Sequence, residues 1–288
     1  MRMRVVVLLA LVLLSCAGAA AQQMQQAQPI TFVSDYWARP GKEADFLDLI
    51  KTVGGPVRDK LMADGVVLGW GVDVPFMRMP GQPTHTIWYD VADWAGIEKV
   101  QAAMAARLAQ LDDDDKKAAE DARKKNVKPG KSFRERVDEI LDQSKTRDWI
   151  FRNLAVTSGK TPPSAGAMPF TRINSILVKP GMFREWRETF DRFIKPTLDK
   201  MASDGTIYAW GLGQEEVKTE GSFTHFVWVS YPNLASLEKV RNAFGEAFAA
   251  RSAETNEHFN HMFTMTADPN AARSFILRAV IFKMAPQR

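Results

Sequence analysis

An internal repeat constrains the fold of this chain more than any other feature of its sequence. Residues 84–89 read THTIWY, and residues 224–229, which lie 140 positions later, read THFVWV. Aligned at this offset without a gap, residues 40–100 and 180–240 share seventeen identities in sixty-one positions. Such a period is typical of a fold assembled from repeated units. We therefore predict a tandem duplication.

Residues 1–21 have the pattern of a signal peptide. Arg2 and Arg4 form a positively charged start, residues 5–14 are apolar, and residues 19–21 are small and suit a cleavage site. A helix needs about 20 apolar residues to span a bilayer, so this segment is too short, and no longer apolar run follows. We predict an exported protein without a transmembrane segment, located in the periplasm or secreted.

Cys16 leaves a second route of processing open. Residues 13–16 read LLSC and are similar to a lipoprotein cleavage site, at which Cys16 would carry a lipid and anchor the protein at the outer membrane. Cys16 is the single cysteine of the sequence, so the segment after it has no disulfide, no thiol nucleophile and no cysteine-ligated metal. The net charge of +4 on 288 residues is too small to indicate a nucleic-acid partner.

The segment after the signal peptide contains the same succession of elements twice. A Gln-rich, flexible leader at residues 22–29 comes first, and apolar periodicities of 2 and 3.6 then predict strands and helices. In the first unit, residues 30–157, we predict strands at 30–38, 66–74, 84–91 and 148–156, and helices at 42–63, 93–125 and 133–141. After a linker at residues 158–169, we predict for the second unit, residues 170–284, strands at 171–178, 207–212, 224–229 and 275–282, and helices over 183–201 and after Asn233.

Local signals predict where the helices of the first unit break or begin. Residues 54–56 read GGP and should bend or split the first helix, because a proline ring clashes with the preceding turn and donates no hydrogen bond. Gly65 should end that helix, and Asp93 should cap the next one. The first unit is about fourteen residues longer than the second between its second helix and last strand, so we predict a charged, solvent-exposed helical insertion near residues 111–131.

The predicted order of strand, helix, strand, strand, helix, strand is the ferredoxin-like β-α-β-β-α-β arrangement. Residues 178–181 read VKPG, and residues 38–41 read ARPG. This strand-turn-helix opening resembles antibiotic-monooxygenase and NIPSNAP-like members of the dimeric α/β-barrel superfamily. The resemblance implies an α+β fold in which two ferredoxin-like units form one barrel, here as an intramolecular pseudo-dimer. Members include cofactor-free monooxygenases, haem enzymes, isomerases and proteins without a known reaction, so no activity and no catalytic residue transfers.

Polar residues at matching strand positions are the first candidates for a site. His85 and His225 form one pair, which would act as general bases or metal ligands at a pocket, or alternatively would satisfy backbone groups within the fold. Arg152 and Arg278 form the other pair, which would bind a ligand carboxylate, or alternatively would pair with helix acids such as Asp59 or Asp199. The sequence does not show which strand face lines the barrel.

Aromatic residues and two late histidines complete the candidates. A symmetric set of tryptophans would either pack as core or line a pocket for an aromatic or other apolar ligand. Two histidines three positions apart share one helix face and form a weak candidate metal or haem site, because zinc sites normally take three or four ligands. The tryptophans are Trp70, Trp88, Trp210 and Trp228, and the histidines are His258 and His261.

Three hypotheses about function follow, and they leave open whether the protein is an enzyme. The first is an exported small-molecule-binding protein or cofactor-independent enzyme of the dimeric α/β-barrel type. The second is a non-catalytic envelope protein with a filled barrel that binds another protein, and the third is a haem or metal protein. We expect no cofactor. The sequence contains no glycine-rich phosphate loop, no GxSxG motif and no HExxH motif, so nucleotide hydrolysis, esterase chemistry and zinc-dependent proteolysis lack support.

Overall fold

The computed structural model describes residues 28–160, 163, 166–217 and 223–285. The predicted signal peptide, Cys16, most of the leader and part of the linker lie outside the described residues. Within the described part, no helix combines the length and apolar character that a membrane span requires.

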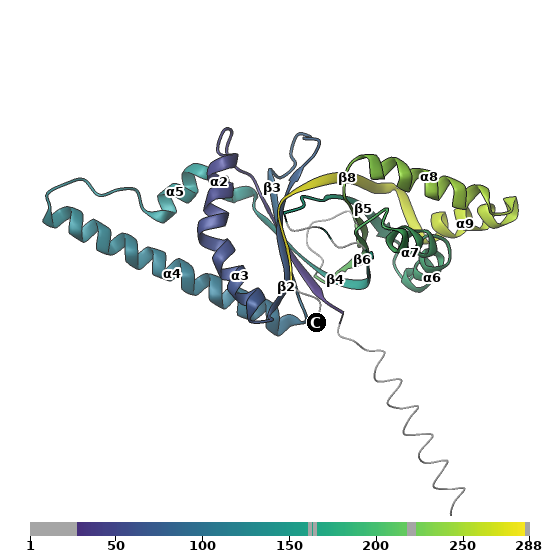
Figure 1. Cartoon of the computed structure of the whole chain (residues 1–288), viewed down its shortest axis with the longest axis horizontal. Coiled ribbons are helices and arrows are strands. Elements are labelled where there is room, and N and C mark those ends of the chain that lie inside the picture. The colour runs from purple at the N-terminus through teal and green to yellow at the C-terminus, as the bar shows by residue number, and fades with distance from the viewer. Residues whose placement is uncertain (1–27, 161–162, 164–165, 218–222, 286–288) are drawn as a thin grey trace, which may run out of the picture.

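Eight antiparallel strands close into one barrel (Figure 1). Their order around the barrel is β1-β3-β2-β8-β5-β7-β6-β4, and β4 pairs with β1 to close it. The predicted α+β class and barrel are confirmed. The strands are β1 (Ile30–Tyr36), β2 (Val67–Pro75), β3 (His85–Val91), β4 (Arg147–Ser158), β5 (Phe170–Val178), β6 (Ala209–Glu215), β7 (His225–Tyr231) and β8 (Ala267–Met284).

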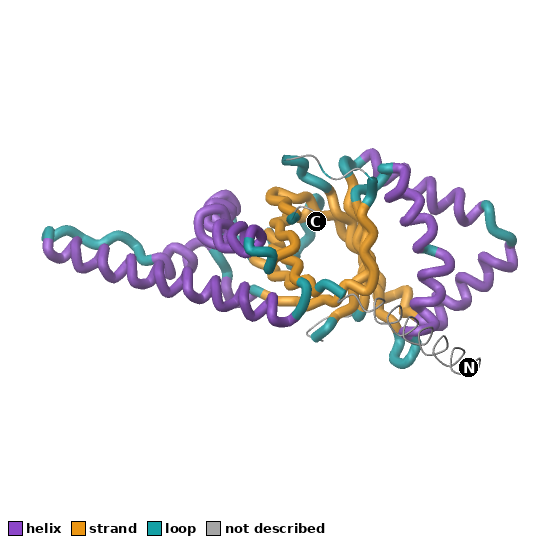
Figure 2. The backbone as a smooth tube through the Cα atoms, turned by 60° about the horizontal axis from the view of Figure 1, so that its bottom comes forward, coloured by secondary structure: helices purple, strands orange, loops and turns teal. Residues whose placement is uncertain are grey.

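We call residues 30–158 the first half of the barrel and residues 170–284 the second half. The strands of each half are neighbours, in the order β4-β1-β3-β2 and β8-β5-β7-β6. The halves meet at two seams, where β2 pairs with β8 and β4 pairs with β6. The tube in Figure 2 shows the strands grouped at the centre between two sets of helices.

Helices cover the outside of the barrel on two opposite sides (Figure 1). Each set encloses a hydrophobic core against its own strands, and burying one large apolar side chain contributes about 1.5–3 kcal/mol. The first core includes Phe46, Ile50, Trp70, Tyr89 and Val100, and the second includes Trp186, Phe190, Leu198, Trp210 and Val229. The first-half helices are α2 (Glu43–Leu49), α3 (Gly55–Ala63), α4 (Trp94–Lys124) and α5 (Phe133–Ile140), and the second-half helices are α6 (Phe183–Phe193), α7 (Lys195–Asp204), α8 (Ala235–Ala249) and α9 (Ala253–Thr266).

The predicted helix breaks and caps are confirmed. A π-helical turn, η1 (Ile50–Gly54), interrupts the helix between α2 and α3, and Pro56 lies in the first turn of α3. Gly65 follows α3 with a φ of 76°, a left-handed conformation that favours glycine. The Asp93 side chain accepts a hydrogen bond from the Gly96 N–H at the start of α4.

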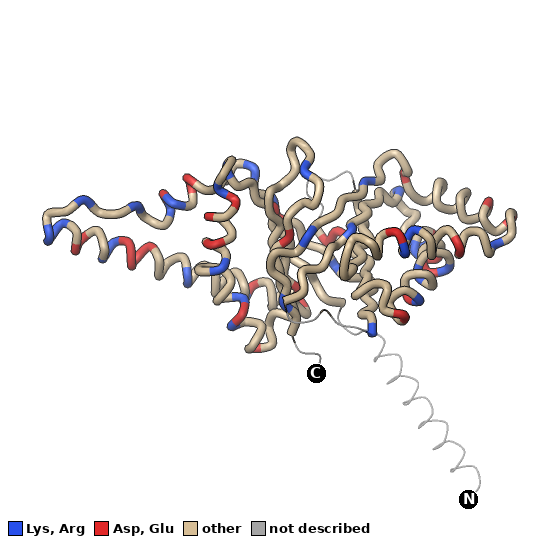
Figure 3. Tube along the Cα trace, turned by 45° about the horizontal axis from the view of Figure 1, so that its top comes forward, with Lys and Arg blue, Asp and Glu red and all other residues tan. Residues whose placement is uncertain are grey.

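The charged segment continues α4 as a helix that projects from the barrel. Only the first turns of α4 bury side chains, among them Ile97 and Val100. Figure 3 shows acidic and basic residues along the projecting part. The side chain of Asp115 accepts a hydrogen bond from the Phe133 N–H, and Arg134 pairs with Asp112, so the start of α5 is attached to α4.

Two elements differ from the prediction. The last strand begins at Ala267 instead of residue 275, because Ala267 and Asp268 already pair with Val178 and Leu177 of β5. The register then shifts across residues 269–272, and pairing resumes at Arg273. Asp268, Pro269 and Asn270 rarely favour strands, so their composition did not indicate this extension. The long helix expected after Asn233 is two helices, α8 and α9. The Ser252 side chain accepts a hydrogen bond from the Thr255 N–H and starts the second one.

Glycines on β2 and β6 allow tryptophan rings to lie flat against the sheet. A methyl group at Gly71 would lie 2.7 Å from Trp88 Cζ2 and 2.7 Å from the Ile281 carbonyl oxygen. A methyl group at Gly211 would meet the ring of Trp228 in the same way. The space beside each ring is therefore the space that a side chain on β2 or β6 would need.

We predict that Gly71→Ala destabilises the protein by about 1–3 kcal/mol, because overpacking forces side chains and backbone apart. Gly245→Ala is the matched control, since a methyl group there meets nothing within 4 Å and alanine favours a helix. Urea unfolding of the two variants measures the difference. Equal stability of both variants would show that the position of the Trp88 ring does not require a glycine at position 71.

Candidate functional site

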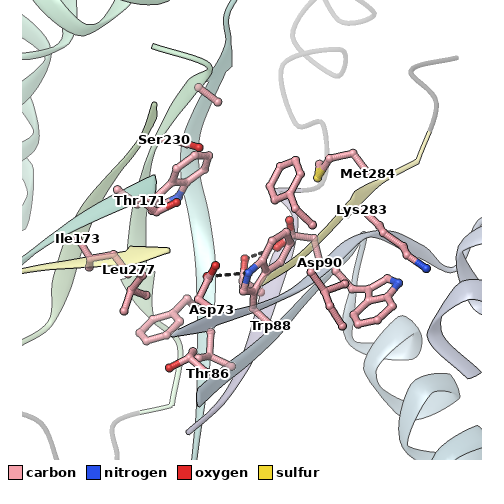
Figure 4. A pocket seen from close by; sticks show the side chains of 18 of the residues that line it. Asp73, Thr86, Trp88, Asp90, Thr171, Ile173, Ser230, Leu277, Lys283 and Met284 are labelled. Carbon is pink, nitrogen blue, oxygen red and sulfur yellow. Dashed lines mark hydrogen bonds between the residues drawn. The ribbon is translucent and has the colours of Figure 1, made fainter. Parts of the chain in front are cut away.

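A cavity of about 1630 Å³ occupies the interior of the barrel and extends to residues on the helix side of the first half, among them Lys51, Asp59 and Trp70. Strand residues alternate between it and the helices, as β3 shows: Thr86, Trp88 and Asp90 border the cavity, whereas His85 and Tyr89 lie in the core under the helices. Figure 4 shows Thr171, Ile173 and Leu277 of the second half across the cavity from Asp73 and Trp88 of the first.

Asp73 on β2 is the most unusual group in the cavity. Its side chain is only 7% exposed, and Trp88 Nε1 donates a hydrogen bond of 3.0 Å to Oδ2. Among the described residues, no donor contacts the other oxygen. Burial raises the pKa of the Asp73 carboxyl from 3.8 to about 7, although the indole hydrogen bond opposes the rise. Asp73 can therefore exchange a proton near neutral pH.

Asp35 on β1 lies on the far side of β3 from Asp73, because the strand register places Thr86 between them. Its carboxylate is fully hydrogen-bonded: Thr86 Oγ1 donates at 2.6 Å to one oxygen and Trp149 Nε1 donates at 3.0 Å to the other. Burial raises its pKa, and these two hydrogen bonds oppose the rise. Asp35 thus fixes the positions of Thr86 and Trp149. Both of its oxygens already accept hydrogen bonds, whereas Asp73 has one oxygen left for a ligand.

Asp90 is the third acid of the cavity and lies at the other end of β3. Thr31 Oγ1 donates a 2.5 Å hydrogen bond to its Oδ1, and Asn153 Nδ2 donates at 2.8 Å to Thr31 Oγ1. Burial raises the pKa of Asp90 to about 6. These contacts form a chain of polar groups that runs along the cavity wall from β4 to β3.

The second half lacks all three acids. The positions 140 residues later than Asp35, Asp73 and Asp90 hold serine, glycine and serine: Ser175, Gly213 and Ser230. Phe226 takes the place that Thr86 has in the first half, and its ring occupies the space that a side chain at position 213 would need. The cavity therefore has an acidic wall in the first half and a neutral, aromatic wall in the second.

Two polar atoms of the second-half wall have no partner among the described residues. Ser230 is 5% exposed, and its buried hydroxyl lacks a hydrogen bond. Trp228 Nε1 has no acceptor in the described part of the chain, because its counterpart Trp88 uses Asp73 and position 213 is glycine. Both atoms therefore keep an unused hydrogen-bonding group beside the cavity.

An aromatic cluster lies where β4 and β7 approach inside the barrel. The rings of Phe151 and Phe226 meet edge to face with centroids 4.5 Å apart, and Trp149 stacks near Phe151 at 6.4 Å. Phe223 contacts the Trp149 ring at 5.6 Å. Such rings give a ligand apolar area with defined geometry.

The repeated histidines, predicted as ligand-binding candidates, lie outside the cavity. His85 packs edge-on against Phe46 with centroids 5.0 Å apart, and His225 lies 5.1 Å from Phe183 and 5.0 Å from Trp186. Each imidazole Nδ1 contacts the hydroxyl of the threonine before it, at 3.0 and 2.8 Å. Burial lowers the pKa of both histidines to about 4, so both are neutral at pH 7.

The repeated threonines explain why this motif is kept in both halves. Thr84 N–H donates to the Tyr36 carbonyl, and its hydroxyl accepts from the Ala38 N–H at 2.8 Å. Thr224 makes the same contacts with Ile176 and Val178, at 3.0 Å each. The motif thus fixes the end of the first strand of each half.

The arginine pair also lies away from the acids of the cavity. Arg152 forms a bidentate ion pair with Glu216, at 2.9 and 2.7 Å, rather than with Asp59 or Asp199. Those two aspartates instead pair with Lys283 and Lys195. Arg278 is exposed.

The remaining candidates separate into two groups. Trp70, Trp88 and Trp228 border the cavity, whereas Trp210 does not. The buried Trp70 and Trp210 also pack in the cores under the helices, and they donate to Asp59 and Asp199 at 3.0 and 3.1 Å. The other candidates are the exposed His258 and His261 on α9. Within the described residues, no group of three or more His, Cys, Asp or Glu side chains could hold a metal ion.

Sequence reasoning missed the three acids because it searched for residues that the two units share. Each acid is a single charged residue in an otherwise apolar strand. Once it is known which face of the strand borders the cavity, a lone acid on that face indicates a candidate site residue. The difference between the units at these positions, rather than their agreement, indicates the site.

Comparison with known proteins supports the fold. No protein-family model matches the chain, and no curated protein sequence matches it. A solved structure described as "putative monooxygenase", from Fusobacterium nucleatum subsp. nucleatum, aligns with a TM-score of 0.56 and 15% identity over 90% of this chain and 95% of its own. A second structure with that description, from Lactobacillus acidophilus NCFM, has a TM-score of 0.52 and 11% identity over 88% of this chain and 99% of its own. These likenesses show a fold of the dimeric α/β-barrel type.

The raised pKa of Asp73 predicts a pH dependence of stability. Folded Asp73 holds its proton up to about pH 7 and unfolded Asp73 only to 3.8, so the free energy of unfolding falls as pH rises through this range. The shift corresponds to at most about 4 kcal/mol. We expect Asp73→Asn to remove this loss, and Asp48→Asn, at an exposed acid of α2, to keep it. Urea unfolding between pH 4 and 8 tests this, and parallel curves for all three proteins would contradict it.

The buried histidines predict the opposite slope. Folded His225 stays neutral down to about pH 4 and unfolded His225 takes a proton at 6.5, so the free energy of unfolding falls as pH falls through this range. We expect His225→Phe, which keeps an aromatic ring beside Trp186, to lose less stability on acidification, by up to about 3 kcal/mol. Thermal melts at pH 4.5 and 7 measure this, with His261→Phe on the surface as control. A variant as acid-sensitive as the wild type would refute a neutral, buried His225.

Proposed function

We propose that the protein is a small-molecule-binding protein or cofactor-independent enzyme of the dimeric α/β-barrel type, and that its ligand occupies the barrel. The observation that carries this proposal is the placement of Asp73. It presents one oxygen, which has no partner among the described residues, to a large cavity with aromatic walls. A concave apolar site with few, well-placed polar groups is the usual form of a ligand pocket.

Asp73 would act as the acid–base group of such a site. A carboxyl whose pKa is about 7 is half ionised at neutral pH, which suits both taking up and returning a proton. Its carboxylate would remove a proton from an O–H, N–H or activated C–H group of the bound molecule and become the carboxylic acid. The Trp88 indole would hold the carboxyl in place while the proton moves.

The reaction class remains part of the proposal. The descriptions of the two solved structures suggest monooxygenation, and removal of a proton from the substrate is a step for which this chain offers a group. None of the four histidines of the chain borders the cavity, so a haem or metal protein receives no support from a histidine ligand there. A filled barrel with a purely interacting role does not agree with a cavity of about 1630 Å³.

The origin and location of the protein belong to the same proposal. We propose a tandem duplication that makes the barrel an intramolecular pseudo-dimer, similar to antibiotic-monooxygenase and NIPSNAP-like proteins. The seventeen identities at the 140-residue offset and the equal strand order of the two halves support it. Residues 1–21 support export, with cleavage after Ala21 or lipidation of Cys16 as the two routes.

We predict that the uncharged fluorescent probe N-phenyl-1-naphthylamine binds inside the barrel. Ile173→Trp places a large ring in the cavity and should weaken binding at least about tenfold, because it removes the volume that the probe needs. Leu108→Trp adds the same ring on the exposed face of α4 and should leave binding unchanged. Probe fluorescence during titration measures both affinities.

Asp73→Asn separates binding from chemistry in the same assay. It should bind the probe as the wild type does, because the probe needs no carboxylate. Native mass spectrometry of freshly purified protein would detect a retained ligand and show its class. Equal probe binding by the wild type and Ile173→Trp would place the binding site outside the barrel and overturn the proposal.

A further inference from the structure

We propose that the natural ligand is an amine, and that its protonated amino group binds the free oxygen of Asp73 in the first half of the barrel. This inference rests on the proposed function and names the chemical class of its ligand. It is carried by the placement of charge, aromatic faces and unpaired polar atoms around the cavity.

The first argument is the missing counter-ion. Among the described residues, no basic side chain contributes to the pKa of Asp73 or Asp90, because burial and one hydrogen bond each are the causes of their shifts. On the neighbouring strands, Asp73 faces Thr86 of β3 and Ala279 of β8, and Asp35 lies beyond Thr86. Burying a carboxylate without a cation costs free energy. A cationic ligand would pair with this charge and offset that cost.

Basic residues at the edge of the cavity do not fill this role. In the part of the chain that the structure describes, four basic residues border the cavity, all four are exposed, and two of them have other partners. The guanidinium of Arg147 lies 5.4 Å from the Trp37 ring, and Lys283 donates to Asp59 at 2.7 and 2.8 Å on the helix side. The four residues are Lys51, Arg147, Lys160 and Lys283.

The second argument is the aromatic surface beside Asp73. One face of the Trp88 ring lies over Gly71, so the ring is held flat against β2, and its N–H is fixed on Asp73. A cation within about 6 Å of an indole face is attracted by the negative face of the ring. An ammonium group bound to Asp73 would lie beside this ring.

The third argument gives the ligand an orientation. Ser230 Oγ and Trp228 Nε1, on the opposite wall, lack partners among the described residues. Ser230 borders the cavity and can donate its hydroxyl proton, and the indole can only donate. The ligand should therefore carry a hydrogen-bond acceptor, such as a carbonyl or ether oxygen, at the end remote from its amino group.

An amine ligand should release a proton from Asp73 when it binds, and this release can be measured. Below about pH 7 Asp73 holds a proton, so binding an ammonium group must release that proton to the solvent and leave a carboxylate paired with the cation. Each pH unit below the pKa then costs about a factor of ten in affinity. A neutral hydroxyl ligand bound to the carboxylic acid releases no proton.

Isothermal titration calorimetry with three indoles tests the amine. Tryptamine, tryptophol and indole-3-propionate share a ring and differ in an ammonium, a hydroxyl and a carboxylate group. We expect tryptamine to bind at least about tenfold more tightly than tryptophol at pH 8, and indole-3-propionate to bind weakest, because like charges repel. At pH 6 in two buffers of different ionisation enthalpy, tryptamine binding should release close to one proton.

Two variants identify the counter-ion. Asp73→Asn should bind tryptamine and tryptophol alike, whereas Asp48→Asn should keep the preference. If Asp73→Asn fails to fold, the double variant Asp73→Gly and Thr86→Phe replaces it, because the second half already accommodates the pair Gly213 and Phe226. It too should lose the preference for tryptamine.

The outcomes separate the two proposals. Equal binding of tryptamine and tryptophol to the wild type, blocked in both cases by Ile173→Trp, would overturn the amine and leave the small-molecule proposal intact. Absence of tryptamine binding to a protein that binds N-phenyl-1-naphthylamine would do the same. Retention of the tryptamine preference by Asp73→Asn would overturn the assignment of the counter-ion.

Discussion

The pairing of strands across the two seams is the interaction on which the rest of the structure depends. Without the β2–β8 and β4–β6 pairs, each half would be an open sheet with two bare edges and an interior face in contact with water. Closure pairs those edges and removes the interior face from bulk solvent. Only then are Asp35, Asp73 and Asp90 desolvated, so the acid–base properties of the site are a result of closure rather than of any single residue.

Periodicity in the sequence predicted the scaffold because burial imposes it. The stripe of Trp186, Phe190 and Phe193 follows the turn of a helix, and residues 171–178 alternate as a strand does. Pairing with a distant strand leaves no such mark. Residues 267–274 therefore extend β8 against their own composition, and the break between α8 and α9 depends on a serine cap that local patterns did not single out.

The candidate site was less predictable, for a related reason. Residues shared by the two halves, such as His85 and His225, maintain strand ends and helix packing that both halves need. A site for one ligand at the centre of the barrel needs the halves to differ. The first half has Asp73 and Thr86 where the second half has Gly213 and Phe226. A phenyl ring thus replaces a carboxylate at almost the same place in the barrel, and a search for identical residues in the two halves does not find this change.

The length of β8 has a consequence for how the protein reaches this state. This strand spans Ala267–Met284 and pairs with β5 of its own half and with β2 of the first half. The first half therefore keeps an unpaired edge until the last strand of the chain has been synthesised, and its contacts join residues some two hundred positions apart. Long-range pairing of this kind folds slowly, so the edge of the first half stays open while the remainder of the chain is still being made.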